Sequence, residues 1–511
     1  MDRGEAGIFG LRMRPTRILR DPLLAITLIA LVPRLLAALF SGGYFAQDDH
    51  FLVIESAASW ADGSDYNNWL PWHQTGTPTP SGHSMVYPGL HFLLFKLFHL
   101  LGLHDPEGAM IVIRLLHALW SLVVVRTGYR IAAELGGAEI AWRIGLLLAL
   151  FYFMPFLAVR NLVEVACIPF LMLGVRSLMR QDGTPWRSAL VAGIWLGLAM
   201  NVRFQTMLFA AGAGSGLLLE RRWREVVPFA LGVALPIVLL QGGIDLFIWG
   251  RPFAEIGEYV RYNAANATTY FDQPWYNYLL VLAGIFLFIG PFVLFGYFRR
   301  WRPLVPWLAV FAFLAFHSWH PNKQERFILP IVPLVLVLGS TAWERWRTAS
   351  EWWSRRAVLW RWIMGATWAL NVLLLVVLTF TYSKRGRVEA MKMLGGLPEV
   401  HGYIEEDSAE GEAPLLPLYY MGRWDIGQAW VTDTTTDLCA LRAGFIPAVR
   451  PNYVLFIGEE DLNGRMARVQ RQLGPLRVEG EARPSLVDRV VHWLNPVNRN
   501  ETIVVTRLER P

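Results

Sequence analysis

Long apolar runs are the feature that most restricts what this chain can fold into. Stretches such as VPFALGVALPIVLLQGGIDLFIW and WIMGATWALNVLLLVVLTF are long enough to cross the roughly 30 Å of hydrocarbon in a bilayer. Only 17% of the residues are charged, against about 25% in a soluble domain. The sequence therefore predicts an integral membrane protein with many helical crossings. Apolar runs occur at residues 22–40, 85–103, 109–133, 139–157, 160–179, 186–200, 203–219, 226–249, 276–298, 303–318, 326–345 and 357–382.

The basic loops indicate the sidedness of these runs, because Lys and Arg are enriched in cytoplasmic loops. An arginine-rich lead at 12–20 places the N-terminus inside, and the basic loops at 220–225, 299–302 and 344–356 are also predicted inside. These loops together place the C-terminal tail outside, whereas twelve crossings from an inside start would leave it inside. One of the twelve apolar runs is therefore expected not to cross the membrane. The run at 85–103 contains Pro, Gly, Lys and His, so we expect it to lie on the outer interface as an amphipathic helix. About eleven transmembrane helices remain.

Two polar regions accompany this predicted all-α bundle. Residues 42–105 are expected to form one large external loop that contains interfacial helices. Beyond the membrane domain, 1–383, residues 384–511 are polar and combine strand-like runs (YVLFIG, ETIVVTRL) with helix-like runs (LNGRMARVQRQL, SLVDRVVHWL). They predict a small C-terminal soluble α/β domain, also on the external side.

Composition and motifs exclude several function classes. The net charge of +6 is explained by arginines in the loops, so no nucleic acid partner is predicted. The chain has no Walker loop, dinucleotide fingerprint or zinc motif, which argues against direct use of a nucleotide or nucleotide sugar. Its two cysteines, Cys167 in an apolar run and Cys439 in the polar tail, predict no disulfide. No cofactor is assigned.

Two adjacent carboxylates, Asp48 and Asp49, follow the first apolar run. One explanation is a solvated helix N-terminus, where acidic residues favour the positive end of the helix dipole. If 48–60 is a helix, however, Asp48 and Glu55 share one face. Partly desolvated carboxylates at a membrane edge can act as a general base or hold a divalent metal. The metal therefore stays possible without being assigned.

Charged residues also occur at the predicted outer ends of later crossings. Arg160 and Glu164 lie in FLAVRNLVEVACIPF, and Arg203 lies between two apolar runs. Charges in a membrane span are costly and usually paired. A structural Arg–Glu pair, with Arg203 as an interfacial anchor, explains these residues as well as a substrate site does.

A long predicted external loop, 250–275, carries Tyr262 and Asn263 and leads into an aromatic cluster with Trp275 and Tyr276. Aromatic belts are common at membrane interfaces, so anchoring is the simpler explanation. The apolar face of a sugar ring also stacks on Trp and Tyr, which makes a glycan site the alternative.

Four ionisable residues crowd the outer end of another run: His320, Lys323, Glu325 and Arg326. Cations on the outer side run against the positive-inside bias, and an anionic ligand such as a phosphate would explain them. Together with the external carboxylates and aromatics, this cluster predicts a site that moves a group off a phosphate. The membrane surroundings indicate that the phosphate belongs to a lipid.

Over residues 22–345 the sequence resembles the lipid-linked mannosyltransferases of glycosyltransferase family 22, which have the GT-C membrane fold. It departs from that family's pattern at five positions, so the acceptor or the sugar could differ: Gln47 (Pro in the family), Asp49 (Glu), Leu52 (Gln), Asn322 (His) and Gln324 (Glu). Four stretches carry the resemblance: Gln47-Asp48-Asp49-His50-Phe51-Leu52 with Glu55; Arg160, Asn161 and Glu164; Asp245, Tyr262, Asn263 and Pro274-Trp275-Tyr276 with Tyr278; and Asn322-Lys323-Gln324-Glu325-Arg326-Phe327 with Pro330.

This resemblance implies an inverting transfer of mannose from a polyprenyl-phosphate-mannose donor to a lipid or glycan acceptor. Asp48 would be the general base, with Asp49 as the alternative. The family pattern further implies two groups of binding residues. Lys323, Arg326 and Arg203 would neutralise the lipid phosphate, and Glu55, Arg160, Glu164, Tyr262, Asn263, Trp275, Tyr276, His320 and Glu325 would hold the acceptor or the sugar.

Three alternatives stay open. A secondary transporter would place ionisable residues near the bilayer midplane and often contains inverted repeats, whereas these charges sit at helix mouths and no repeat is found. A membrane scaffold could act through its tail. A related enzyme could use another lipid-linked sugar, such as glucose or arabinose. We expect an integral protein of the inner or plasma membrane in a bacterium, or of the ER membrane in a eukaryote, with its active site on the external or lumenal side.

Overall fold

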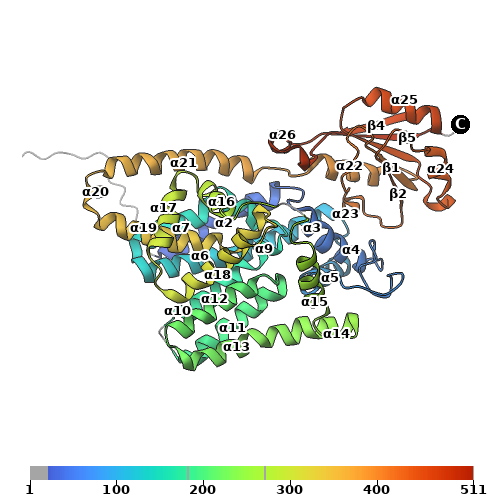
Figure 1. The fold of residues 1–511 in the computed structure, drawn as a ribbon. Helices are drawn as coiled ribbons and strands as arrows, with labels where there is room; N and C mark the ends of the chain where they lie inside the picture. The colour runs from blue at the N-terminus through green and yellow to red at the C-terminus, as the bar shows by residue number, and fades with distance from the viewer. Residues whose placement is uncertain (1–20, 181–182, 270–271, 510–511) are drawn as a thin grey trace, which may run out of the picture.

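The computed structural model describes residues 21–180, 183–269 and 272–509. The arginine-rich lead at 12–20, from which the inside start was predicted, lies outside the described residues. The described chain forms a large helical body, coloured blue to orange in Figure 1, and a small sheet with its own helices near the C-terminus, coloured red. The sheet lies beyond one end of the helical body (Figure 1).

The named elements of the larger part are all helices. Between α2 and α21 the described elements are α2 (Pro22–Phe40), α3 (Gln47–Asp49), η1 (His50–Glu55), α4 (Ser56–Ala61), α5 (Val86–Leu100), α6 (Pro106–Gly136), α7 (Ala138–Leu150), α8 (Phe153–Ala158), α9 (Val163–Ala166), α10 (Ile168–Met179), α11 (Pro185–Val202), α12 (Thr206–Leu219), α13 (Trp223–Pro236), η2 (Ile237–Gly242), α14 (Gly243–Trp249), α15 (Ala254–Ala265), α16 (Asn277–Ile285), η3 (Leu287–Ile289), α17 (Gly290–Arg299), α18 (Leu304–Trp319), η4 (Glu325–Ile331), α19 (Val332–Ala349), α20 (Glu351–Ser354) and α21 (Ala357–Thr379).

Within the described residues, five helical stretches are long and apolar enough to cross a membrane: Pro22–Phe40, Pro106–Gly136, Trp223–Trp249, Glu325–Ala349 and Ala357–Thr379. Four shorter apolar helices accompany them, at Val86–Leu100, Thr206–Leu219, Leu287–Arg299 and Leu304–Trp319. The predicted helical membrane body is therefore present, but the number of eleven crossings is not confirmed.

One reason for the difference is that several apolar runs are broken. The run predicted at 139–157 is two helices, α7 and α8, with Phe151 extended between them. Asn371 of α21 satisfies the broken backbone, because its side chain accepts from the Tyr152 N–H at 2.8 Å and donates to the Leu150 carbonyl at 2.9 Å. A polar side chain on a distant helix thus makes a break tolerable inside apolar surroundings.

Small residues let the helices of the bundle approach closely. A Cβ on Gly193 of α11 would lie 2.2 Å from the Phe229 carbonyl oxygen of α13, and one on Gly232 would lie 2.2 Å from the Leu190 carbonyl oxygen. Glycine at both positions therefore allows backbone-to-backbone contact of α11 with α13, as is common between membrane helices.

The C-terminal part contains a five-stranded sheet in the order β2-β1-β3-β5-β4. Strands β1 to β3 are parallel, with Ile404 opposite Val454, and β5 runs antiparallel to both β3 and β4, with Leu455 opposite Val505. The elements are α22 (Arg385–Gly396), β1 (Gly402–Glu406), α23 (Leu418–Met421), β2 (Gly427–Val431), α24 (Leu438–Ala443), η5 (Pro447–Val449), β3 (Tyr453–Ile457), α25 (Leu462–Leu473), β4 (Leu476–Ala482), α26 (Leu486–Leu494), η6 (Pro496–Asn498) and β5 (Ile503–Leu508).

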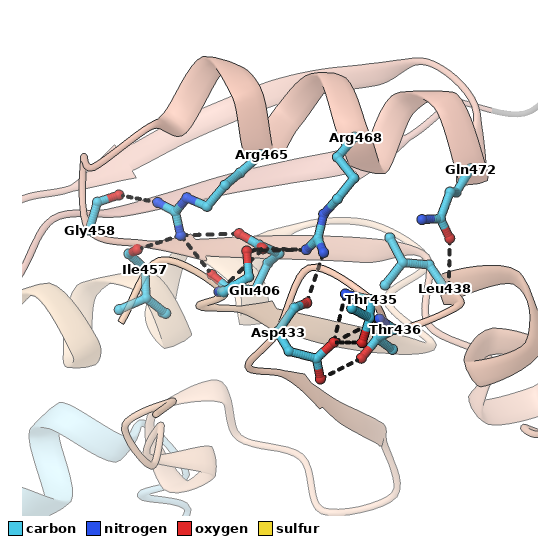
Figure 2. Close-up of polar contacts among 11 residues, drawn as sticks. Glu406, Asp433, Thr435, Thr436, Leu438, Ile457, Gly458, Arg465, Arg468 and Gln472 are labelled. Carbon is cyan, nitrogen blue, oxygen red and sulfur yellow. Dashed lines mark hydrogen bonds and ion pairs between the residues drawn. The ribbon is translucent and has the colours of Figure 1, made fainter. Parts of the chain in front are cut away.

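Buried ion pairs fasten α25 to the carboxyl end of this sheet. Figure 2 shows Arg465 and Arg468 reaching from α25 to Glu406 at the end of β1, at 3.1 and 2.6 Å. Glu406 is fully buried, and Arg468 also donates to the Asp433 carbonyl at 2.8 Å. Because each charge is paired and hydrogen-bonded, its burial is compensated.

Candidate active site

A tight turn after α2 leads to the segment that carries Asp48 and Asp49. Gly43 has φ +70°, and a Cβ there would lie 1.8 Å from the Ser383 carbonyl oxygen, so only glycine fits. The buried Arg160 guanidinium donates to the carbonyl oxygens of Ser41, Gly42 and Gly43 at 3.4, 3.0 and 3.1 Å. Arg160, predicted to hold acceptor or sugar, therefore fixes the turn that precedes the carboxylates.

The predicted helix over 48–60 is present, but with a π-helical segment inside it: α3, η1 and α4 follow one another from Gln47 to Ala61. Such segments are rare and often occur at functional sites. Because the wider turn rotates the residues after it, Asp48 and Glu55 do not share a face as predicted. The Asp48 side chain is 57% exposed, whereas that of Glu55 is fully buried.

Arg326 is the partner of both carboxylates. Its Nη2 donates to Asp48 Oδ2, and its Nη1 donates to Asp49 Oδ2 at 2.6 Å. Its Nε donates to Gln324 Oε1 at 2.8 Å. The planar guanidinium thus bridges two adjacent acids through two separate nitrogens, a rigid fork that Lys lacks. The structure brings together residues that the sequence assigned to the base and to the phosphate site.

Asp49 differs from its neighbour in its surroundings. Its side chain is buried, and the Val163 N–H donates to Oδ1 at 2.8 Å. Burial, followed by the nearby charge of Glu164, raises the pKa of Asp49 to about 7, although Arg326 acts in the opposite direction. Asp49 is therefore an anchored carboxyl, while Asp48 is the one open to a substrate.

A second ion pair lies next to the first. Arg203 Nη1 donates to Glu164 Oε1 at 2.5 Å, and Arg326 Nε lies 3.8 Å from the same oxygen. Both members of the pair are buried, at 8% and 1% exposed. Arg203 Nε and Nη2 have no hydrogen-bond partner among the described residues. Unsatisfied buried donors are costly, so these two N–H groups suit an anionic ligand.

Lys323, predicted to neutralise the lipid phosphate, contacts backbone carbonyls. Its ammonium donates to the carbonyl oxygens of His320, Pro321 and Gln273 at 2.5, 3.4 and 2.9 Å. An ammonium has three donors, and all three point at carbonyls. Lys323 therefore joins the segment around residue 321 to the end of the long loop at residue 273.

The residues predicted to stack on a sugar lie near this junction in the chain. Trp275 is 65% exposed and its ring meets that of Tyr276 edge-on at 5.8 Å. Tyr262 is half-exposed, and Asn263 donates to the Tyr259 carbonyl of its own helix at 2.8 Å. Among the charged candidates, Glu325 is exposed and His320 is half-buried. These positions leave the aromatic rings accessible to a ligand.

The chain beyond residue 383 reaches back to the carboxylate helix. Glu55 Oε1 accepts from the Tyr419 N–H at 3.1 Å and lies 3.4 Å from His50 Nε2. The His50 ring stacks between Tyr44 and Tyr420, with centroids 4.4 and 5.6 Å apart. Glu55, predicted to position the acceptor, thus joins the π-helical segment to α23.

Glu255 and His83 were not among the residues that the sequence predicted for the site. Glu255 Oε2 accepts from Ser81 Oγ, Gly82 N and His83 N at 3.1, 2.6 and 3.2 Å. It fixes the first loop so that His83 lies within electrostatic reach of Asp48. Burial raises the pKa of Glu255 to about 7. Glu255 itself lies in the loop that was predicted to bear sugar-binding residues.

The possibility of a divalent metal has no cluster to support it in the described chain. Over 21–180, 183–269 and 272–509, no group of three or more His, Cys, Asp or Glu residues could hold a metal ion. Arg326 is ion-paired with both Asp48 and Asp49.

Comparison with known proteins connects this cluster to a family. The Alg9-like mannosyltransferase family matches residues 25–403, a stretch that contains every candidate residue above. The chain belongs to this family. It is thus a membrane glycosyltransferase, and the enzyme interpretation is favoured over a transporter. GPI mannosyltransferase 3 of Drosophila melanogaster is 24% identical to it over 424 residues, covering 78% of this chain and 68% of the fly protein.

Solved structures of similar fold are GT-C enzymes. ArnT from Cupriavidus metallidurans in the apo state gives a TM-score of 0.61 at 15% identity, over 96% of this chain and 99% of that chain. ArnT bound to undecaprenyl phosphate gives 0.62 at 14% identity, with the same coverage. At these identities the likeness shows the fold, which is the GT-C fold that the sequence resemblance predicts.

Proposed function

We propose that this mannosyltransferase-family protein transfers mannose from a polyprenyl-phosphate-linked donor to a hydroxyl group of a lipid-linked or other external acceptor, with inversion. The observation that carries the proposal is the Asp48–Arg326–Asp49 bridge beside the Glu164–Arg203 pair. The half-exposed Asp48 carboxylate contacts one guanidinium, Arg326, and Arg326 and Arg203 both approach Glu164 Oε1. A carboxylate beside guanidinium groups is what removal of a proton and departure of a phosphate together require.

In this reaction Asp48 accepts the proton of the acceptor hydroxyl. Arg326 holds Oδ2, and the side chain is 57% exposed, so a hydroxyl can approach Oδ1. The acceptor oxygen bonds to the anomeric carbon from the face opposite the phosphate. The bond from that carbon to the phosphate oxygen breaks, and its electron pair leaves with the lipid phosphate.

The departing phosphate gains negative charge, which Arg203 and Arg326 neutralise. Arg203 has two buried N–H groups without a partner in the described chain, and hydrogen bonds from Arg to phosphate are among the strongest in proteins. ArnT has been solved with undecaprenyl phosphate bound, a leaving group of the proposed kind. We assign Lys323 and Arg160 a supporting part, since both donate to backbone carbonyls.

The sugar and acceptor parts of the site extend from this centre. Glu164, Tyr262, Asn263, Trp275, Tyr276, His320 and Glu325 are proposed to contact them, with Trp275 the most exposed of the aromatics among these. Glucose and arabinose are the competing sugars.

The test is turnover by the purified protein in liposomes. Labelled polyprenyl-phosphate-mannose, polyprenyl-phosphate-glucose, a polyprenyl-phosphate-linked arabinose and GDP-mannose are supplied in parallel with a panel of glycolipid acceptors. Transfer from the lipid-linked mannose alone, with the opposite anomeric configuration in the product, supports the proposal. Transfer from GDP-mannose, or transfer only of another sugar, contradicts it.

We also propose eleven crossings, with the Asp48 side and a separate domain at 384–511 both on the external or lumenal face. The tail offers a native reporter, since Cys439 is exposed and Cys167 is buried. A membrane-impermeant maleimide applied to intact cells or to lumen-outward vesicles is expected to label Cys439. Labelling only after the membrane is permeabilised would reverse the proposed orientation.

A further inference from the structure

Helix α26 exposes its apolar side chains and buries a charged one, which is the opposite of what a helix on a soluble domain does. Leu486, Val490, Trp493 and Leu494 are 68, 47, 79 and 69% exposed, whereas Asp488 is buried. The apolar side chains are spaced four, seven and eight residues from the first, so they share one face. In a soluble domain such a face would point to the core, and here it points away from it.

The same apolar surface continues past the helix. Val497 in η6 is 75% exposed, and Trp493, the most exposed of the set, is a residue type that gathers at membrane–water interfaces. Contiguous exposed apolar surface on a soluble domain marks a binding site for a protein or a membrane. The position of α26 in the fold decides between these partners.

Asp488 ties α26 to the end of a membrane helix. Its two carboxylate oxygens accept from the Lys384 and Arg385 N–H groups, both at 2.9 Å. Lys384 Nζ donates to the Asn498 carbonyl at 2.8 Å. Since α21 ends at Thr379, Lys384 lies only five positions further along the chain, a span of at most about 18 Å.

Other exposed apolar groups lie at the ends of the neighbouring membrane helices. Phe40 ends α2 and Phe380 follows α21, both are about half-exposed, and their rings lie 5.5 Å apart. Figure 1 shows α26 beyond the end of α21, between the helical body and the sheet. The apolar face of α26 is thus near the level at which the membrane helices leave the hydrocarbon.

We infer that α26 and η6 form an interfacial anchor whose occupant is the lipid bilayer, with Leu486, Val490, Trp493, Leu494 and Val497 inserted among the headgroups and upper acyl chains. An amphipathic helix of this kind lies in the plane of the interface with its apolar face buried about 5–10 Å. The sheet would then be held against the membrane from two sides, by α21 and by α26.

The test places a nitroxide spin label on the full chain in vesicles of phosphatidylethanolamine and phosphatidylglycerol. Trp493→Cys, Leu494→Cys and Val497→Cys are each made in a Cys439→Ser background, and Cys167 is buried. Arg471→Cys, on the exposed side of α25, is the matched control. Each label is then probed with oxygen, which partitions into lipid, and with a water-soluble nickel chelate.

Labels at 493, 494 and 497 are expected to lose relaxation by nickel and gain relaxation by oxygen, while the label at 471 shows the reverse. Equal nickel accessibility at 493 and 471 would overturn the inference. Protection from both reagents, with dipolar broadening between labels, would also overturn it, because the occupant would then be a second copy of the chain. All the substituted side chains are exposed, so we expect every variant to fold.

Discussion

Arg326 Nη1 and Asp49 Oδ2 lie 2.6 Å apart, although 277 positions separate the two residues in the chain. Asp49 comes from the short helix after α2, and Arg326 comes from η4 at the start of the stretch that leads into α19. The contact therefore joins α3 to η4 and also forms part of the candidate site. Changes to either residue are expected to affect both stability and turnover.

Arg326→Gln is expected to lower the free energy of unfolding by about 3–5 kcal/mol, because it leaves Asp49 buried beside Glu164 without its cation. Arg326→Lys keeps the charge but replaces the planar fork, whose separate nitrogens reach Asp48 and Asp49, with a single nitrogen, so we expect it to fold and yet lose most turnover. Thermal unfolding and transfer assays check both. Arg355→Gln, whose side chain is 77% exposed, is the control, and an Arg326→Lys enzyme of full activity would refute the bridging role.

Arg203→Lys is expected to weaken binding of undecaprenyl phosphate by about tenfold or more, since a hydrogen bond to a charged group contributes about 1.5–3 kcal/mol. The variant keeps the charge opposite Glu164 but removes the two guanidinium donors that lack a partner among the described residues. Titration of the lipid phosphate into detergent-solubilised protein measures the effect. The exposed Arg187 provides the matched Arg187→Lys control. Unchanged affinity would remove Arg203 from the phosphate site.

Asp49→Asn is expected to change how stability depends on pH. Burial raises the pKa of Asp49 to about 7, from 3.8 in an exposed carboxyl. Between about pH 4 and 7 the folded protein keeps a proton that the unfolded chain has released, so this group lowers the free energy of unfolding as pH rises. The Tm of wild type should therefore fall relative to that of Asp49→Asn across this window. Parallel curves would show that Asp49 titrates normally.

Tyr420→Ala is expected to cost about 3–5 kcal/mol of stability and to reduce kcat with little change in the KM for the lipid donor. Tyr420 is buried and stacks on His50, the residue that follows Asp49, so its loss would loosen the carboxylate helix rather than the phosphate site. Trp430→Ala, half-exposed on β2, should leave kcat unchanged. A Tyr420→Ala enzyme that is destabilised but turns over normally would limit this contact to a structural role.

The carboxylates and Arg326 could be predicted from the sequence because their positions are unusual: acids directly after an apolar run, and cations where the positive-inside bias disfavours them. Arg160 and Lys323 satisfied the same criteria, yet both donate to backbone carbonyls. A sequence shows where a cation is but not which acceptor faces it, so structural and ligand-binding cations look alike.

Glu55 shows a second limit. Its spacing from Asp48 suggested a shared face only under α-helical geometry, and the π-helical segment η1 lies between them. Nothing in HFLVIE distinguishes a π turn from an α turn. The broken apolar runs are a related case, since the break after α7 depends on Asn371, more than two hundred residues away. Such features come from tertiary contacts, which local patterns do not record.

The most direct test of the account is mannose release from polyprenyl-phosphate-mannose by wild type, Asp48→Asn and Asp425→Asn in liposomes. Asp425 is 82% exposed and provides the matched control. Loss of a general base lowers rates by about 10²–10⁴-fold, so Asp48→Asn should fold, bind the lipid and lose turnover by that order, while Asp425→Asn keeps it. Turnover by Asp48→Asn at the wild-type rate would contradict the assignment of Asp48 as the base.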